Sequence, residues 1–296
     1  MPQVISGRGV LYPTRLPTFQ RVAPPTELAD LIRWFWIPRW DLPPGPSSRQ
    51  HVLPFPASNL VVEPNGVTLQ GPTTRASYRD LRGRGWAVGA LLRPAAVGSL
   101  CDEPSSIRDR TITIDAPELH AAVVTAMQGA DETDAAAHAA AAFASWAEAR
   151  VTPADEGGLL ANTIEDLIAS DSQIVRIDQI AKLINISARH VQRVTHRYVG
   201  VPPLAVIRRY RLQEAAERIR EDRSLTIGQV AADVGYADHA HLTRDFRQVL
   251  GLAPVDYRRG LRPQAQSDAV RLRLAPQACR SQTAADNQQG PNLNQH

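Results

Sequence analysis

The chain has 296 residues, of which 43% are hydrophobic, and its formal net charge is +3. This length predicts two domains, each large enough to bury a core. Only two cysteines occur, Cys101 and Cys279, far apart and in no ligand-like spacing, so we expect neither a disulfide framework nor a zinc site.

The charge is distributed unevenly along the chain. Residues 1–159 carry 14 basic and 16 acidic side chains, whereas residues 160–262 carry 16 and 12. Almost all basic residues are arginines, and Lys182 is the single lysine. GC-rich coding explains the preference for arginine, but it does not explain where the charge lies. The C-terminal excess therefore favours a nucleic-acid partner.

The N-terminus has no charged flank leading into an apolar stretch, and no run of about 18 apolar residues occurs anywhere. We therefore expect a cytoplasmic protein with no membrane contact.

Residues 1–115 are predicted to be rich in β-strands, because prolines are too dense here for long helices. Residues 60–62 and 67–69 flank an Asn-Gly pair, which predicts a hairpin. Further strands are expected at 86–92 and 111–114. This half also holds Trp34, Trp36, Trp40, Phe55 and Trp86. Core packing is the commoner use of such aromatic residues, and a ligand pocket is the alternative.

No metal or catalytic site is expected in this half. His51 and Glu63 lack partner histidines at metal-ligand spacing. We find no nucleophile–base arrangement distinguishable from chance, so we expect no enzyme activity, no cofactor and no metal.

Residues 117–149 are dominated by alanine and predict two helices, broken at 129–131. These helices can cover the β layer or pair between two copies, and the sequence does not favour either. A linker is expected at 151–159 and helices throughout 160–260. The tail, 263–296, is rich in Gln, Asn, Ser and Ala and is predicted to be disordered.

An internal repeat lies in the helical part. Residues 177–181 recur as 227–231, and the match continues through the next 25 or so positions. Each copy follows the pattern of a helix-turn-helix, with units at about 177–199 and 227–250. Asn185 or Gly235 ends the first helix, and Ser187 or Asp238 caps the second.

The second helices are predicted at 188–199 and 238–250, and each ends at a glycine. Between the two units, residues 203–221 predict one long helix that acts as a rigid spacer. The polar side chains of the second helices are the candidates for DNA contact: Arg189, His190, Gln192, Arg193, His196, Arg197, His239, His241, Thr243, Arg244 and Arg247. A helical bundle with a solvated polar face is the alternative, but repetition of the cap, the stop and the exposed arginine in register favours DNA binding.

Residues 160–260 resemble the DNA-binding domain of the AraC/XylS family of bacterial transcription regulators. The resemblance rests on Arg211, Leu212 and Ala215 of the spacer, and on these residues of the second copy: Ile227, Gln229, Val230, Ala231, Val234, Gly235, Tyr236, Asp238, Leu242, Arg244, Phe246, Gly251, Pro254, Tyr257 and Arg258. It implies that both second helices enter successive major-groove segments.

The resemblance also suggests roles for individual residues. Arg189, Gln192 and Arg193, with His239, His241, Thr243 and Arg244, become candidates for base contact, although Arg193 and Arg244 can equally bind phosphate. Asp245, where such proteins vary, would set the target sequence. Phosphate or solvent contacts are expected for Arg197, Arg208, Arg209 and Arg247.

Residues 1–150 resemble, more loosely, the N-terminal domain of an actinobacterial subgroup of AraC-type regulators. The matching segments are 71–74, 88–96 and 107–110. This implies a sensing or dimerising role without a defined ligand. The expected fold class is therefore α+β: a β-rich domain with two helices (1–150), then an all-α domain of two helix-turn-helix units joined by a long helix (160–262).

The expected function is sequence-specific transcriptional regulation through double-stranded DNA. Alternatives are an architectural DNA-binding protein and a DNA-repair enzyme carrying this type of DNA reader, the latter disfavoured because only Cys101 lies in the N-terminal half. Further candidate partners are RNA polymerase, a small-molecule effector at the N-terminal domain and a second copy of the chain.

Overall fold

The structure is a computed structural model that describes residues 18–45, 47–52, 54–129 and 131–260. The tail predicted to be disordered, 263–296, lies outside the described residues.

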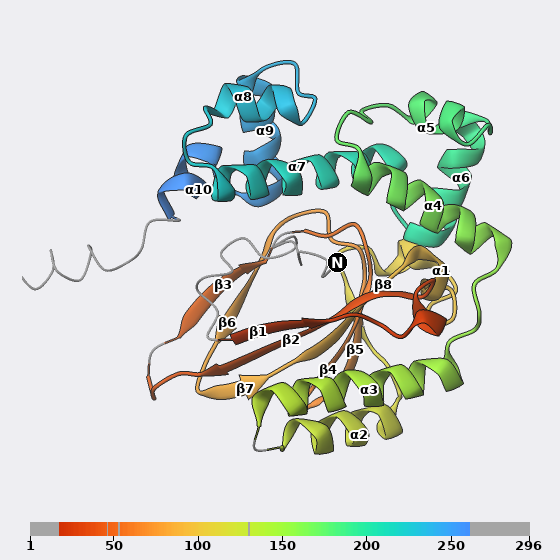
Figure 1. The fold of residues 1–296 in the computed structure, drawn as a ribbon, viewed down its shortest axis with the longest axis vertical. Coiled ribbons are helices and arrows are strands. Elements are labelled where there is room, and N and C mark those ends of the chain that lie inside the picture. Colours follow the sequence, from red (N-terminus) through yellow and green to blue (C-terminus); the bar gives the residue numbers. More distant parts are fainter. Residues whose placement is uncertain (1–17, 46, 53, 130, 261–296) are drawn as a thin grey trace, which may run out of the picture. The chain divides into compact units, whose positions relative to one another are not determined.

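The N-terminal half is built around an antiparallel sheet (Figure 1). Seven strands of the described chain form it, six of them in the order β1 (Thr18–Val22), β2 (Ile32–Asp41), β8 (Val88–Leu92), β4 (Asn59–Glu63), β5 (Gly66–Gln70) and β9 (Thr111–Thr113). The seventh, β7 (Arg84–Trp86), pairs with β2. Two other strands, β3 (Ser48–Val52) and β6 (Ser77–Leu81), pair only with each other in the described residues and form a separate ribbon.

The predicted hairpin is confirmed, because β4 and β5 pair in register across Pro64–Asn65, with Glu63 opposite Gly66. The strand expected at 86–92 is interrupted. The amide of Ala87 donates to the carbonyl of Pro38 at 3.2 Å, and the chain divides there into β7 and β8, both paired with β2.

The two predicted alanine-rich helices are present as α2 (Pro117–Met127) and α3 (Glu132–Arg150). They cover one face of the sheet, where Phe35 of β2 lies 5.4 Å from Phe143 of α3, measured between ring centroids. Small side chains let the helices pack closely on the strands. Short turns, η2 (Thr26–Leu28), α1 (Pro94–Val97) and η3 (Pro104–Ile107), lie in the connections.

Helices follow through the rest of the described chain: α4 (Glu156–Ser170), α5 (Ile177–Leu183), α6 (Ala188–Val199), α7 (Pro203–Glu221), α8 (Ile227–Asp233), α9 (His239–Leu250) and α10 (Pro254–Gly260). The bounds of α6 and α7 are those predicted. The linker expected at 151–159 ends earlier, because the Asp155 carboxylate accepts the amide of Gly158 at 2.6 Å and starts α4 at Glu156.

The two helix-turn-helix units have different cores. The core of the first unit includes Phe55, Ala57 and Leu91 from the β-rich half, together with residues of α4 to α7. The buried core of the second unit contains only residues of α7 to α10. The first unit is therefore continuous with the sheet, whereas the second is a largely separate cluster at the other end of α7 (Figure 1).

No described helix has both the length and the apolar character needed to cross a membrane.

Candidate nucleic-acid interface

Helix α6 is fixed by a cap at each end. The Ser187 hydroxyl accepts the amide of His190 at 3.1 Å, and Gly200 ends the helix with φ of 78°. Val191, Val194, Thr195 and Val199 are buried, while Arg189, Gln192, Arg193, His196 and Arg197 are exposed. His190 is half-buried. The predicted polar face of the first unit therefore lies open to solvent.

Helix α9 repeats this arrangement. The Asp238 carboxylate accepts the amide of His241 at 2.7 Å, and Gly251 ends the helix with φ of 75°. His239, His241, Arg244 and Arg247 are exposed, and Thr243 is half-buried. The His241 ring meets Tyr236 edge to face at 5.1 Å, so the turn between α8 and α9 positions this candidate.

The turns of the two units also correspond. Asn185 and Gly235 both have positive φ, 53° and 72°, as expected for the residue that ends each first helix. At the start of those helices, the Gln179 side chain accepts the amide of Arg176 at 2.9 Å and the Gln229 side chain that of Thr226 at 2.8 Å. The repeated glutamine is thus a capping residue, a role that its position three residues after Thr226 could have revealed.

Four arginines on these faces are available for an external partner. Within the described residues, the guanidinium groups of Arg189, Arg193, Arg244 and Arg247 make no hydrogen bond and no ion pair. Arg197 lies over the ring of Tyr198, 5.5 Å from its centroid. By contrast, many other arginines are paired with carboxylates, such as Arg33 with Glu165 at 2.9 Å. Both faces therefore present cations suited to phosphate or guanine.

Asp245 does not belong to the exposed face, contrary to its expected role in setting the target sequence. It is 6% exposed, and it is bound by Arg208 through two hydrogen bonds, one of them 2.7 Å long. The Tyr236 hydroxyl donates to the same carboxylate at 3.1 Å. The bond to Asp245 raises the pKa of Arg208. Asp245 thus joins α9 to α7 and to the preceding turn.

Two arginines of α7 also differ from expectation. Arg208 is engaged by Asp245 and also donates to Gln248 at 2.7 Å. Arg209 is 6% exposed, and burial lowers its pKa to about 10. The phosphate or solvent contact expected for Arg209 is therefore wrong, because the side chain folds back along α7 to the carbonyl of Ala205.

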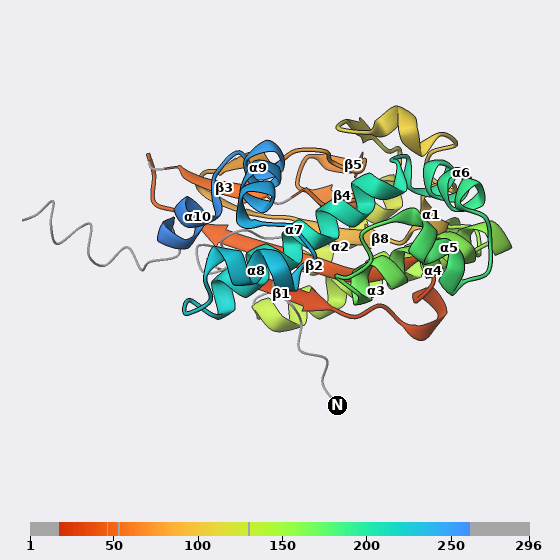
Figure 2. The ribbon, with the colours of Figure 1, turned by 90° about the horizontal axis from the view of Figure 1, so that it is seen from above.

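Helices α6 and α9 lie at opposite ends of α7. In Figure 2, α6 and α9 are on the same side of α7, while α5 and α8 are on the other. Buried residues of α7 belong to both cores: Ile207 and Tyr210 to the first, Leu212 and Ile219 to the second. One continuous helix therefore sets the separation of the two exposed faces.

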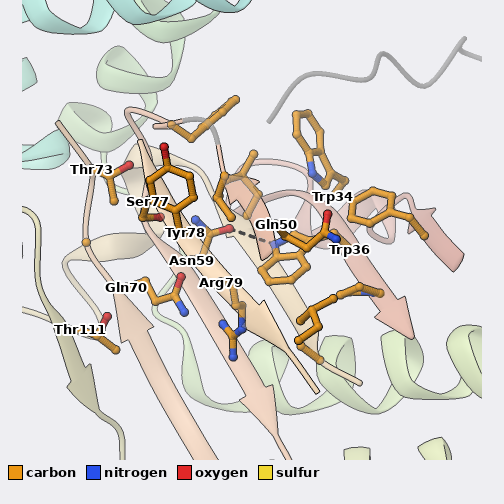
Figure 3. Close-up of a pocket in the computed structure, with 18 of the residues that line it drawn as sticks. Trp34, Trp36, Gln50, Asn59, Gln70, Thr73, Ser77, Tyr78, Arg79 and Thr111 are labelled. Atoms are coloured by element: carbon orange, nitrogen blue, oxygen red, sulfur yellow. Dashed lines mark hydrogen bonds between the residues drawn. The ribbon is translucent and has the colours of Figure 1, made fainter. Parts of the chain in front are cut away.

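A cavity of about 430 Å³ lies between the sheet and the β3–β6 ribbon (Figure 3). Trp34, Trp36, Trp40 and Phe55 line it. These aromatic residues therefore form the wall of a pocket, which was the alternative to the commoner core packing. Trp86 instead packs against the sheet–helix core, as expected.

In the described residues, no group of three or more His, Cys, Asp or Glu side chains is placed to hold a metal ion. Glu63 is engaged by Arg79, a residue of the cavity wall.

Comparisons with known proteins agree with this architecture. A helix-turn-helix domain family matches residues 180–260, and a domain of unknown function (DUF6597) matches residues 20–113. An uncharacterized HTH-type transcriptional regulator of Haemophilus influenzae is 28% identical over 85 residues, 29% of this chain and 28% of that protein. A putative AraC-like transcription regulator of Streptomyces lividans is 39% identical over 61 residues, 21% of this chain and 20% of the relative.

Among solved structures, ToxT of Vibrio cholerae is 14% identical with a TM-score of 0.41, covering 82% of this chain and 98% of ToxT. The alignments with curated relatives span between 20% and 36% of those proteins' lengths.

Proposed function

We infer from the AraC-type helix-turn-helix domain of its C-terminal region that this chain is a DNA-binding regulator of transcription. The observation that carries this proposal is the pair of equivalent helices, capped and ended in the same way, on which Arg189, Arg193, Arg244 and Arg247 make no hydrogen bond or ion pair within the described residues. In this division of roles, residues 160–262 bind DNA and residues 1–150 supply the regulatory part.

The proposed mechanism places α6 and α9 in successive major-groove segments. Such segments recur every 34–36 Å or so along one side of the duplex. Gln192 is the candidate for adenine, because its amide can bridge N6 and N7. Arg193 and Arg244, in register, are candidates for guanine or phosphate, and Arg197 and Arg247 for phosphate. The remaining candidates for base contact are Arg189, His239, His241 and Thr243, and His190 and His196 complete the predicted DNA-binding set.

Binding-site selection tests the assignment of Gln192. Gln192→Ala should relax the preference at one base pair by about 1–3 kcal/mol and leave the other positions unchanged. Arg197→Ala is the matched control on the same exposed face and should weaken binding to all sequences alike. Identical selected motifs for the wild type and Gln192→Ala would remove Gln192 from the base-reading set.

We propose that the cavity in the β-rich half receives a small-molecule effector. A volume of about 430 Å³ lies in the range of small-molecule sites, and its walls combine aromatic surface with a few polar groups. Pairing of two copies and a contact with RNA polymerase stay predictions, as does the cytoplasmic location.

Two alternatives remain. An architectural protein would occupy the genome diffusely, whereas a regulator would give a few sharp footprints, so genomic footprinting separates them. A repair enzyme would need a reactive cysteine, and the Cys101 thiol donates to the carbonyl of Glu103 at 3.4 Å and belongs to no cluster of three or more metal-ligating side chains in the described chain.

A further inference from the structure

The cavity wall is aromatic because of how β2 is placed. Trp34, Trp36 and Trp40 project from one face of this strand into the cavity, while Phe35 and Ile37 project from the other into the sheet–helix core. The Trp36 ring lies so close over Gly89 of β8 that a side chain there would collide with it. The indoles therefore lie against the sheet and form a broad aromatic floor, which suits a flat molecule.

The polar groups of the cavity are amides and hydroxyls. Asn59 accepts the Trp36 indole N–H at 3.0 Å, which leaves the Asn59 side-chain nitrogen as a donor (Figure 3). In the described residues, the side chains of Gln70 and Thr111 have no hydrogen-bond partner, although both line the cavity. Such groups recognise a carbonyl or hydroxyl rather than a full charge.

The charged groups at the cavity are mostly engaged by the protein. Arg79 is bound to Glu63, and Asp109 accepts the amide and the hydroxyl of Thr74. Arg21 lies over the Trp34 ring, 4.8 Å from its centroid, and Arg110 is exposed. The lining therefore favours an uncharged ligand.

The two helix-turn-helix units contact the β-rich half differently. In the first unit, the buried Asn162 side chain accepts the amide of Ala95 at 3.1 Å and donates to the carbonyl of Asp30 at 2.8 Å. The Tyr210 hydroxyl donates to Glu165 at 2.7 Å, and Glu165 is bound by Arg33. With the shared core, these contacts hold the first unit rigidly on the sheet.

One contact of the second unit lies next to the cavity wall. The amide of Ala76 donates to the carbonyl of Val249, in the last turn of α9, at 2.7 Å. The next residues, Ser77 and Tyr78 of β6, line the cavity, and the Tyr78 hydroxyl lies close to Gly251. An isolated two-stranded ribbon is only marginally stable, so β6 can shift when the cavity fills.

We propose that a flat, uncharged aromatic molecule with a carbonyl or hydroxyl group occupies the cavity, and that its presence is transmitted through β6 to α9 of the second unit. This inference rests on the proposed effector role of the N-terminal half. Filling the cavity displaces the ribbon and breaks the bond between Ala76 and Val249. The last turn of α9 then opens more often, while α6 keeps its position on the sheet.

The ligand class is tested by titrating the full chain with N-phenyl-1-naphthylamine, an uncharged aromatic probe, and with decanoate. We expect saturable fluorescence enhancement by the aromatic probe and no competition by decanoate. Ser77→Trp, which adds a ring at the cavity wall, should weaken binding at least about tenfold. Ala122→Trp, on the exposed face of α2, should not change it. No saturable binding, or displacement by decanoate, would overturn the ligand class.

The transmission is tested by hydrogen exchange on the same protein without DNA. Saturating aromatic probe should accelerate exchange in the last turn of α9 about fivefold, the effect of losing one hydrogen bond, and leave α6 unchanged. Ala76→Pro, which lacks the donor amide, should exchange fast in α9 without the probe, and Ala76→Ser should behave as wild type. Equal changes in the exchange rate of both units, or no change in α9 with the probe bound, would contradict transmission through β6. DNA affinity is measured separately without the probe. A loss of DNA binding in that measurement would mean that the proposed function fails, whatever the outcome for the transmission.

Discussion

Arg244 and Asp245 are neighbours on α9, but their side chains meet different surroundings. Arg244 is exposed and makes no ion pair with the residues that the structure describes, whereas the Asp245 carboxylate is buried between Arg208 and Tyr236. A helix turns 100° or so per residue, so adjacent positions can serve different surfaces. The set of residues predicted to contact DNA therefore cannot be extended along α9 by proximity in sequence.

Substituting these two neighbours should separate stability from DNA binding. Asp245→Ala leaves a guanidinium and a tyrosine hydroxyl without their acceptor, so we expect a loss of about 2 kcal/mol in the free energy of unfolding. Arg244→Ala should leave stability within about 0.5 kcal/mol and weaken DNA binding. Urea unfolding and a DNA titration on both variants provide the check, and a stable Asp245→Ala variant would show that the buried carboxylate does not join α9 to α7.

At the scale of elements, the helices were predictable because their signals are local. The residues that mark the ends of α6 and the start of α7 are Ser187, Gly200 and Pro203, and each lies within or next to its helix. The repeat contains the same cap and stop signals a second time. The β3–β6 ribbon had no such signal, since its partners are about 30 residues apart along the chain. The cavity depends on that ribbon, so its aromatic wall could not be distinguished from ordinary core by sequence alone.

The burial of Asp245 escaped prediction for the same reason. Its partner Arg208 is 37 residues away, on the helix that the sequence identified only as a spacer. The exposed candidates, in contrast, followed from the helical period of their own segments.

The N-cap of α9 is predicted to depend on pH, whereas that of α6 is not. The bond from the His241 amide lowers the pKa of Asp238. Its stabilising effect is therefore complete above the ordinary aspartate pKa of about 3.9 and is lost as the pH falls through the lowered value in the folded protein. Asp238→Ser, which copies the Ser187 cap of α6, should keep the cap at pH 7 and remove this acid-dependent part.

Circular dichroism during urea unfolding at pH 7 and pH 3 measures the difference. Between pH 7 and pH 3, the urea concentration at the midpoint of unfolding should fall further for the wild type than for Asp238→Ser. Ser187→Ala, which has no titratable group, should cost about 1 kcal/mol at both pH values. Equal acid losses in wild type and Asp238→Ser would mean that the Asp238 charge does not stabilise α9.

At the scale of the whole molecule, α7 links α6 and α9 as one rigid element. It has 19 residues, which corresponds to a length of about 28 Å. Its buried side chains belong to the core of the first unit at one end and of the second unit at the other. Neither unit can therefore move far relative to the other without exposing apolar surface.

This rigidity predicts how operator spacing affects affinity. Inserting 5 base pairs between the two half-sites turns the second major-groove segment away and should lower affinity at least about a hundredfold, towards that of one half-site. Inserting 10 base pairs returns the second major-groove segment to the same side of the duplex but moves the half-sites about 34 Å further apart. This is more than the whole length of α7, so affinity should stay low.

A 10-base-pair insertion outside the half-sites is the control and should have no effect in the same gel-shift titration. Two units on a flexible tether would instead recover most of their affinity with the 10-base-pair insertion between the half-sites. That recovery would contradict the role of α7, because its buried residues Tyr210, in the first core, and Leu212, in the second, would then not hold the two units at one separation.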